Sequence, residues 1–127
     1  MSSQIAAAHA VLRRAIVNHM ANELALDRAF AACAHPIRRG IIERLAGGEL
    51  TVGEATRGFP VSKPAISRHL RVLEEAGAIT RVIDGRTHRL RVDGRALAAA
   101  DGWIERQRAL WERKFDVVEE YLAEPQP

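Results

Sequence analysis

The 127-residue chain has a single cysteine, Cys33, and therefore cannot form an intramolecular disulfide. Aromatic residues make up only 5% of it, and no apolar run reaches the roughly 20 residues of a membrane-spanning helix. The first twenty residues lack the basic start, apolar middle and small-residue cleavage site of a secretory signal. These absences argue against a disulfide-rich secreted protein and a helical membrane protein, and we expect a cytoplasmic protein with no membrane partner.

Residue sets for catalysis and metal binding are also scarce. The sequence has no Gly-rich phosphate loop and no Ser/His/Asp set, and Cys33 with His35 is the one nucleophile–base pair, with nothing nearby to activate it. The same two residues are candidate ligands for a soft metal, but they face apart on a helix, and such a metal needs three or four ligands. We therefore expect no enzyme, no metal site and no cofactor.

Charge of one sign is concentrated in the middle of the chain. Residues 57–95 contain nine Lys and Arg against four Asp and Glu, whereas residues 96–127 contain four against seven. A basic middle and an acidic end indicate that the middle contacts a polyanion such as DNA, although a solvated basic surface would give the same count.

Apolar periodicity predicts helices in the first part of the chain. Residues 3–24 and residues 26–34 read as two helices, the first with Ile5, Leu12, Ile16 and Met20 at helical spacing. Pro36 suits the first turn of another helix, which Gly47 and Gly48 end. We treat residues 1–24 as an N-terminal helical extension and residues 25–127 as the folded domain.

A short helix, a turn and a second helix follow. Thr51 and Glu54 have the spacing of a capping box, and Gly58 and Pro60 end the short helix they begin. The stretch "VSKPAISRHLRVLEEAG", residues 61–77, then places Ser62 as N-cap of a helix over residues 62–76, with Pro64 in its first turn.

Two β-prone runs come after this helix, and a last helix ends the chain. The runs flank Asp84-Gly85, a strong hairpin signal, and form a hairpin over about residues 80–92. A long helix is expected over residues 96–123. The order predicts a mainly α (α+β) fold, a winged helix-turn-helix with a two-stranded β wing.

The helix over residues 62–76 is the expected recognition helix. Ile66, Leu70 and Leu73 share one face and point into the core, so the basic side chains project the other way. We assign Arg68 and Lys63 to base edges, and Arg71 to phosphate. Ser67 is assigned to a base or a phosphate. His69 lies at the border of the apolar face and is expected to be packed or hydrogen-bonded.

The hairpin supplies further basic residues. Arg86 at the tip can enter the minor groove, and Arg81, Arg89 and Arg91 on the strands can hold the DNA backbone, unless the strand charges serve only to prevent aggregation. The predicted DNA-binding residues are Ser62, Lys63, Pro64, Ser67, Arg68, Arg71, Arg81, Arg86 and Arg89.

The last helix has an apolar arc of about 160°, wider than one packing contact needs. It therefore predicts packing on its own domain and on a second copy, with a purely intramolecular helix as the alternative. The predicted dimer-interface residues are Trp103, Leu110, Trp111, Phe115, Val118 and Leu122.

The sequence from Leu26 onward, about four-fifths of the chain, resembles the ArsR-type winged-helix repressors of bacteria. The resemblance is carried by "HPIRRGIIERLAGGELTVGE", "VSKPAISRHLRVLEEAGAI" and "DGRTHRL" together, and "WIERQRALWERKFDVVEEYL" looks like a subgroup that lacks a metal site. It implies a homodimer formed by the first and last helices that binds an inverted repeat near a promoter. It also implies repression, often of the protein's own operon, that a signal relieves.

Two departures bear on that signal. Metal-sensing members carry a Cys-x-Cys where this chain has Thr51 and Gly53, and others place ligands along the last helix, which here contains no histidine. Metal sensing is thus disfavoured, and the inducing signal stays unknown. Alternatives are a redox-responsive repressor based on Cys33, which has no second cysteine to resolve it, and a winged-helix module that binds protein and no DNA.

Overall fold

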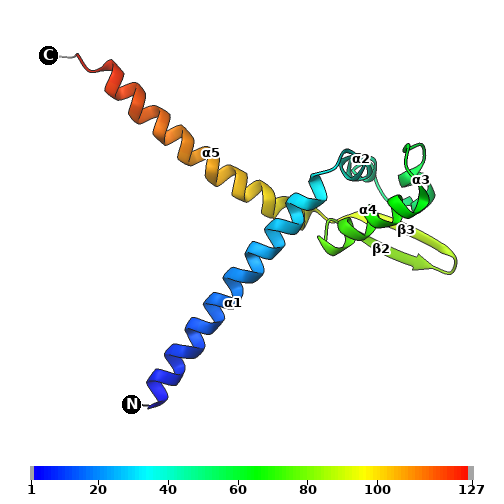
Figure 1. The fold of residues 1–127 in the computed structure, drawn as a ribbon, viewed down its shortest axis with the longest axis horizontal. Coiled ribbons are helices and arrows are strands. Elements are labelled where there is room, and N and C mark those ends of the chain that lie inside the picture. Colours follow the sequence, from blue (N-terminus) through cyan, green and yellow to red (C-terminus); the bar gives the residue numbers. More distant parts are fainter. Residues whose placement is uncertain (1, 126–127) are drawn as a thin grey trace.

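The computed structural model describes residues 2–125 and combines five helices with a small sheet. The elements follow the order α1 (Ser2–Cys33), α2 (Pro36–Leu45), β1 (Leu50–Thr51), α3 (Val52–Thr56), α4 (Lys63–Glu75), β2 (Ile79–Asp84), β3 (Thr87–Val92) and α5 (Gly94–Ala123). In Figure 1, α2, α3, α4 and the sheet form the body, and the two longest helices extend from it as separate arms. The predicted mainly α fold with a β wing is confirmed.

One continuous helix occupies the N-terminal part of the chain, and the predicted division into residues 3–24 and 26–34 is wrong. α1 runs unbroken from Ser2 to Cys33. No Gly or Pro occurs within it, and its many Ala and Leu residues are strong helix formers, so nothing ends the helix near Ala25. It ends at Cys33, and one residue later His35 caps the next helix, which starts at Pro36.

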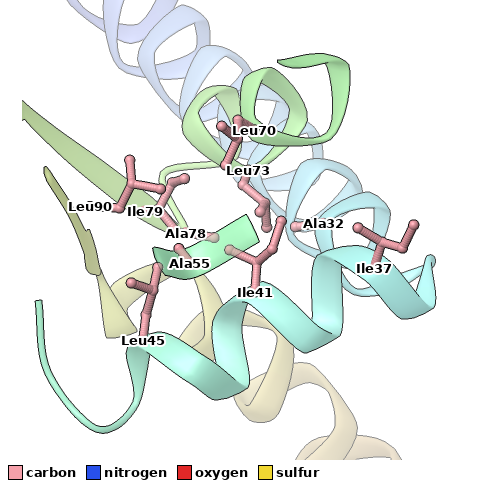
Figure 2. Packing of buried hydrophobic residues seen from close by; sticks show 10 residues of the cluster. All are labelled: Ala32, Ile37, Ile41, Leu45, Ala55, Leu70, Leu73, Ala78, Ile79 and Leu90. Carbon is pink, nitrogen blue, oxygen red and sulfur yellow. The ribbon is translucent and has the colours of Figure 1, made fainter. Parts of the chain in front are cut away.

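The core is made of aliphatic residues from every element of the body. Its fully buried larger side chains are Ile41 and Leu45 of α2, Leu73 of α4, and Ile79 and Leu90 of the sheet. Figure 2 shows these side chains converging, together with smaller residues that allow the helices to approach closely. Because α4 contributes its buried face to this cluster, its opposite face is directed outward.

The sheet has three antiparallel strands in the order β1-β3-β2, where a two-stranded wing was expected. The additional strand, β1, is only two residues long, and it pairs Leu50 with the buried Leu90. Such a short strand has no pattern of its own in the sequence. The predicted hairpin itself is confirmed, since β2 and β3 pair in continuous register around Asp84 and Thr87.

The two arms touch each other only where they leave the body. Phe30 of α1 meets Trp103 of α5 edge to face, with ring centroids 5.6 Å apart. Farther out both helices expose apolar side chains, including Ile16 and Met20 on α1 and Phe115 on α5. None of the helices within residues 2–125 is long and apolar enough to cross a membrane.

α5 starts two residues before the predicted Ala96 because Asp93 caps it. The Asp93 Oδ1 atom accepts a hydrogen bond from the backbone N–H of Arg95 at 3.0 Å. The Arg95 guanidinium also donates to the carboxylate, and this side-chain hydrogen bond is the main reason that the pKa of Asp93 is lowered to about 2. The cap therefore remains ionised at neutral pH.

Candidate nucleic-acid interface

The front end of α4 is built by the residues that the sequence singles out. Ser62 is extended, with φ −69° and ψ 159°, and its Oγ accepts a hydrogen bond from the Ala65 N–H at 3.3 Å. Pro64 occupies the first helical turn, where its missing N–H costs no hydrogen bond. The N-terminal end of α4 therefore starts abruptly at the surface, with its partial positive charge exposed to a potential anion.

One face of α4 is exposed along its whole first half. Leu70 is 3% exposed and Leu73 is fully buried, whereas all five predicted contact residues of this helix are exposed: Lys63, Pro64, Ser67, Arg68 and Arg71. Within residues 2–125, the ion pairs of the structure include none of the three basic residues in this group. Their charge is thus available to an external polyanion.

His69 is turned away from this face, as expected of a packed histidine. Its Nδ1 atom lies 3.0 Å from Nη1 of Arg38, and its ring contacts that of His35 in a tilted arrangement, with 4.3 Å between centroids. Burial, followed by the positive charges of His35, Arg38 and Arg68, lowers the pKa of His69. The neutral ring is thus favoured, and it can accept a hydrogen bond from the Arg38 guanidinium.

The turn between α3 and α4 is held by Arg44 of α2, a residue that sequence reasoning missed. Its Nη1 atom donates to the carbonyl oxygens of Ala55 at 3.2 Å and Arg57 at 2.7 Å. Its guanidinium also lies 4.1 Å from the centroid of the Phe59 ring. This clamp orients α3 and the turn against α2, and no local sequence pattern distinguishes it from a solvated arginine.

The wing places its basic residues in three different environments. Arg86 is exposed beside Gly85, whose φ of +60° allows the tight turn, and none of the ion pairs within residues 2–125 involves it. Arg89 and Arg91 lie on the exposed face of β3, at 4.0 and 3.6 Å from the Glu49 carboxylate. Arg81 points to the opposite face of the sheet, because it pairs with the buried Leu90 in the register.

Arg81 is bonded within the protein. Its Nε and Nη2 atoms donate to Oε1 of Glu74 at 3.2 and 2.5 Å, and Nη1 lies 3.0 Å from Nδ1 of His88. The side chain is only 26% exposed. It joins the wing to the C-terminal half of α4. The sequence gives only a weak indication of this contact, namely opposite charges on either side of the tight turn at Gly77.

Cys33 and the predicted interface residues lie outside this basic surface. Cys33 is half-buried at the end of α1, and no group of three or more potential ligands that could hold a metal occurs in the described part of the chain. The predicted interface residues are exposed, from 39% for Trp103 to 74% for Leu122, with Leu110, Trp111, Phe115 and Val118 between them.

This geometry agrees with that of known proteins. Residues 34–82 match a protein family described as Helix-turn-helix domain. The crystal structure of an ArsR family transcriptional regulator, RHA00566, superimposes with a TM-score of 0.67 at 31% identity, covering 71% of this chain and 93% of that one. The chain belongs to the ArsR family of winged helix-turn-helix transcriptional regulators.

Two similar proteins from bacteria also have names in this class. HTH-type transcriptional regulator Rv2034 of Mycobacterium tuberculosis is 47% identical over 73 residues, which are 58% of this chain and 68% of that protein. Transcriptional repressor SdpR of Bacillus subtilis is 40% identical over 55 residues, 43% of this chain and 61% of that protein. An ArsR-family regulator is a DNA-binding protein, and these relatives are regulators and not enzymes.

Proposed function

We propose that this ArsR-family protein is a homodimeric repressor that binds an inverted-repeat operator through α4 and the β2–β3 wing. The observation that carries the proposal is the exposed, unpaired basic face at the front of α4. In a helix-turn-helix protein the N-terminal residues of the second helix lie at the base edges of the major groove. Arg68 and Lys63 then read bases, Arg71 binds phosphate, and Ser62, Pro64 and Ser67 line the contact.

The wing adds a second contact in this proposal. Arg86 at the tip has the exposure needed to enter the minor groove, and Arg89 lies on the outer face of β3 beside the DNA backbone. Arg81 makes a weaker contact or none, because its guanidinium is already bonded to Glu74. We therefore place Arg81 at the margin of the DNA-binding surface.

Dimerisation is proposed through the two arms. Each exposes an apolar stripe that its own domain leaves uncovered, and α5 carries Trp111 and Phe115 at 56% and 62% exposure. A second copy would bury these stripes and supply the second half-site contact. In this arrangement residues 1–24 extend the dimerisation helix of the domain formed by residues 25–127.

The test begins with selection of genomic fragments bound by the purified protein. Arg68→Ala should lose specific binding to the selected operator by about 10- to 100-fold, as expected for one bidentate contact to guanine. Arg14→Ala, on the charged side of α1, is the matched control and should bind as the unmodified protein does. An Arg68→Ala protein that kept full affinity and specificity would show that α4 does not read the operator.

A further inference from the structure

A groove of about 630 Å³ lies between α3, the turn after it, α4 and the start of β2. Its volume is in the range of sites that hold small molecules, roughly 300–1,000 Å³. The groove opens on the side of the molecule that carries Lys63, Ser67 and Arg71, so its mouth is part of the proposed DNA-binding surface. A molecule held there would stand between α4 and a phosphate backbone.

The floor of the groove is apolar and fixed in place. Val52, Phe59 and Ile66 are partly buried against the core cluster, and Leu70 belongs to that cluster. The Phe59 ring packs against α2, where the Arg44 guanidinium lies 4.1 Å from its centroid and a Cβ added at Gly40 would lie only 3.0 Å from ring atoms. The floor is therefore a preformed apolar surface that gains from being covered by an apolar molecule.

The rim of the groove is positively charged. Lys63 and Arg71 are exposed, and the ion pairs found among residues 2–125 leave both without an acidic partner. Glu74 is the one acid among the described lining residues, and Arg81 neutralises it through two hydrogen bonds to Oε1. A negatively charged group at the mouth would meet two cations and no free carboxylate.

We propose that this groove binds an amphipathic organic carboxylate, whose apolar body covers Phe59 and Ile66 and whose carboxylate pairs with Lys63 and Arg71. The ligand and DNA then require the same two cations, so binding of one excludes the other. This second step rests on the proposed function, and it gives the repressor an inducing ligand of defined chemical class. An inorganic anion would leave the apolar floor uncovered, and a neutral hydrocarbon would leave the cations unpaired.

Binding is tested first without DNA, on the full chain, with naphthalene-2-carboxylate and its neutral analogue naphthalene-2-carboxamide as probes. The carboxylate should cause saturable amide shifts in an NMR titration, confined to α3, the following turn and α4, and should bind about tenfold more tightly than the amide. Lys63→Gln with Arg71→Gln should remove this preference, whereas Arg13→Gln with Arg14→Gln should preserve it. Equal affinity for the two probes, or shifts confined to the exposed arms α1 and α5, would overturn the proposal.

Competition is then measured on a selected operator fragment. The carboxylate should raise the apparent Kd for DNA linearly with its concentration, with an inhibition constant equal to the Kd from the NMR titration. A carboxylate that fills the groove without weakening DNA binding refutes the exclusion step alone. A chain that binds the carboxylate but no DNA fragment contradicts the proposed function and leaves the groove assignment standing.

Discussion

At the scale of single residues, arginines near α4 fall into two groups with different tasks. Arg68 and Arg86 are exposed, and among residues 2–125 the ion pairs involve neither of them. Arg44 and Arg81 instead direct several N–H groups to acceptors within the protein. The first group suits an external polyanion and the second orients the elements that present it. The residue type is the same, and only the position of the acceptors separates the two groups.

The Arg81–Glu74 ion pair should therefore stabilise the fold more than the exposed Arg89–Glu49 pair does. Arg81→Ala should lower the free energy of unfolding by about 1 kcal/mol, because a half-buried guanidinium loses a doubly hydrogen-bonded carboxylate. Arg89→Ala should change it by less than about 0.5 kcal/mol, since its nearest carboxylate is 4.0 Å away. Urea unfolding measures both values. A double-mutant cycle of Arg81→Ala and Glu74→Gln should show a coupling energy between the two residues. Zero coupling would show that this ion pair does not stabilise the fold.

His69 should make stability depend on pH. Its pKa in the folded protein is lowered from 6.5, so the unfolded chain binds a proton at higher pH than the folded protein does. The neutral ring makes its full contribution to the free energy of unfolding above pH 6.5, and this contribution is lost as the pH falls through the lowered pKa. His69→Gln should reduce the change in the thermal unfolding temperature between pH 7.5 and 5. His19→Gln on the exposed α1 arm is the control, and an unchanged profile in His69→Gln would contradict this role.

At the scale of elements, turns and caps position α4. Ser62 caps its start, and Gly77, with φ +69°, turns the chain from its end into β2. Between them the apolar face of α4 is anchored by Leu70 and Leu73. The direction of the basic face thus follows from where the helix begins, where it ends and which side is buried.

Two glycine substitutions should differ in their effect on the free energy of unfolding. Gly77→Ala should destabilise the protein by about 1 kcal/mol, because an L side chain is strained at positive φ even though nothing lies within 4 Å of the added Cβ. Gly53→Ala, within helix α3, should be neutral or stabilising by up to about 1 kcal/mol, since alanine favours the helix. Chemical unfolding of both variants gives the comparison. Destabilisation of equal size in both would mean that φ does not set the cost.

At the scale of the whole molecule, the arms are the unusual feature. Beyond their mutual contact at Phe30 and Trp103, α1 continues for 28 residues and α5 for 20, which corresponds to roughly 42 Å and 30 Å of helix. Their apolar residues contribute little to the core of one chain. In α5, for example, Ala100 is the one buried residue. Each arm therefore leaves an apolar surface that a second copy can cover.

Dimerisation through α5 should fail when its stripe is made acidic. Phe115→Glu with Val118→Glu should convert a dimer into a 14.0 kDa monomer in sedimentation equilibrium, without lowering the stability of the body, because both side chains are exposed in one chain. Operator affinity should fall by about 100-fold or more, since the two half-sites are no longer bound by one particle.

The matched control lies on the same helix. Glu112→Lys changes the charged side of α5 and should leave the mass and the affinity unchanged. An unmodified protein that sediments as a monomer at concentrations well above its operator Kd would contradict the dimer.

Much of the body could be predicted from the sequence, because its signals act over a few residues. Ser62 as cap, Asp84-Gly85 as turn, and the spacing of Ile66, Leu70 and Leu73 specified α4, its buried face and the hairpin. Such signals depend on local hydrogen bonds, backbone preference and helical periodicity, which need no knowledge of distant residues.

Other features depended on residues far apart in the sequence. The pairing of Leu50 with Leu90 created β1, Arg44 reached across to the turn at Arg57, and the groove arose where α3, α4 and β2 meet. A side chain finds such partners only after packing has brought the elements together. The sequence by itself therefore determined which helix carries the basic face, and the tertiary structure decided which of its cations stay free and what lies beside them.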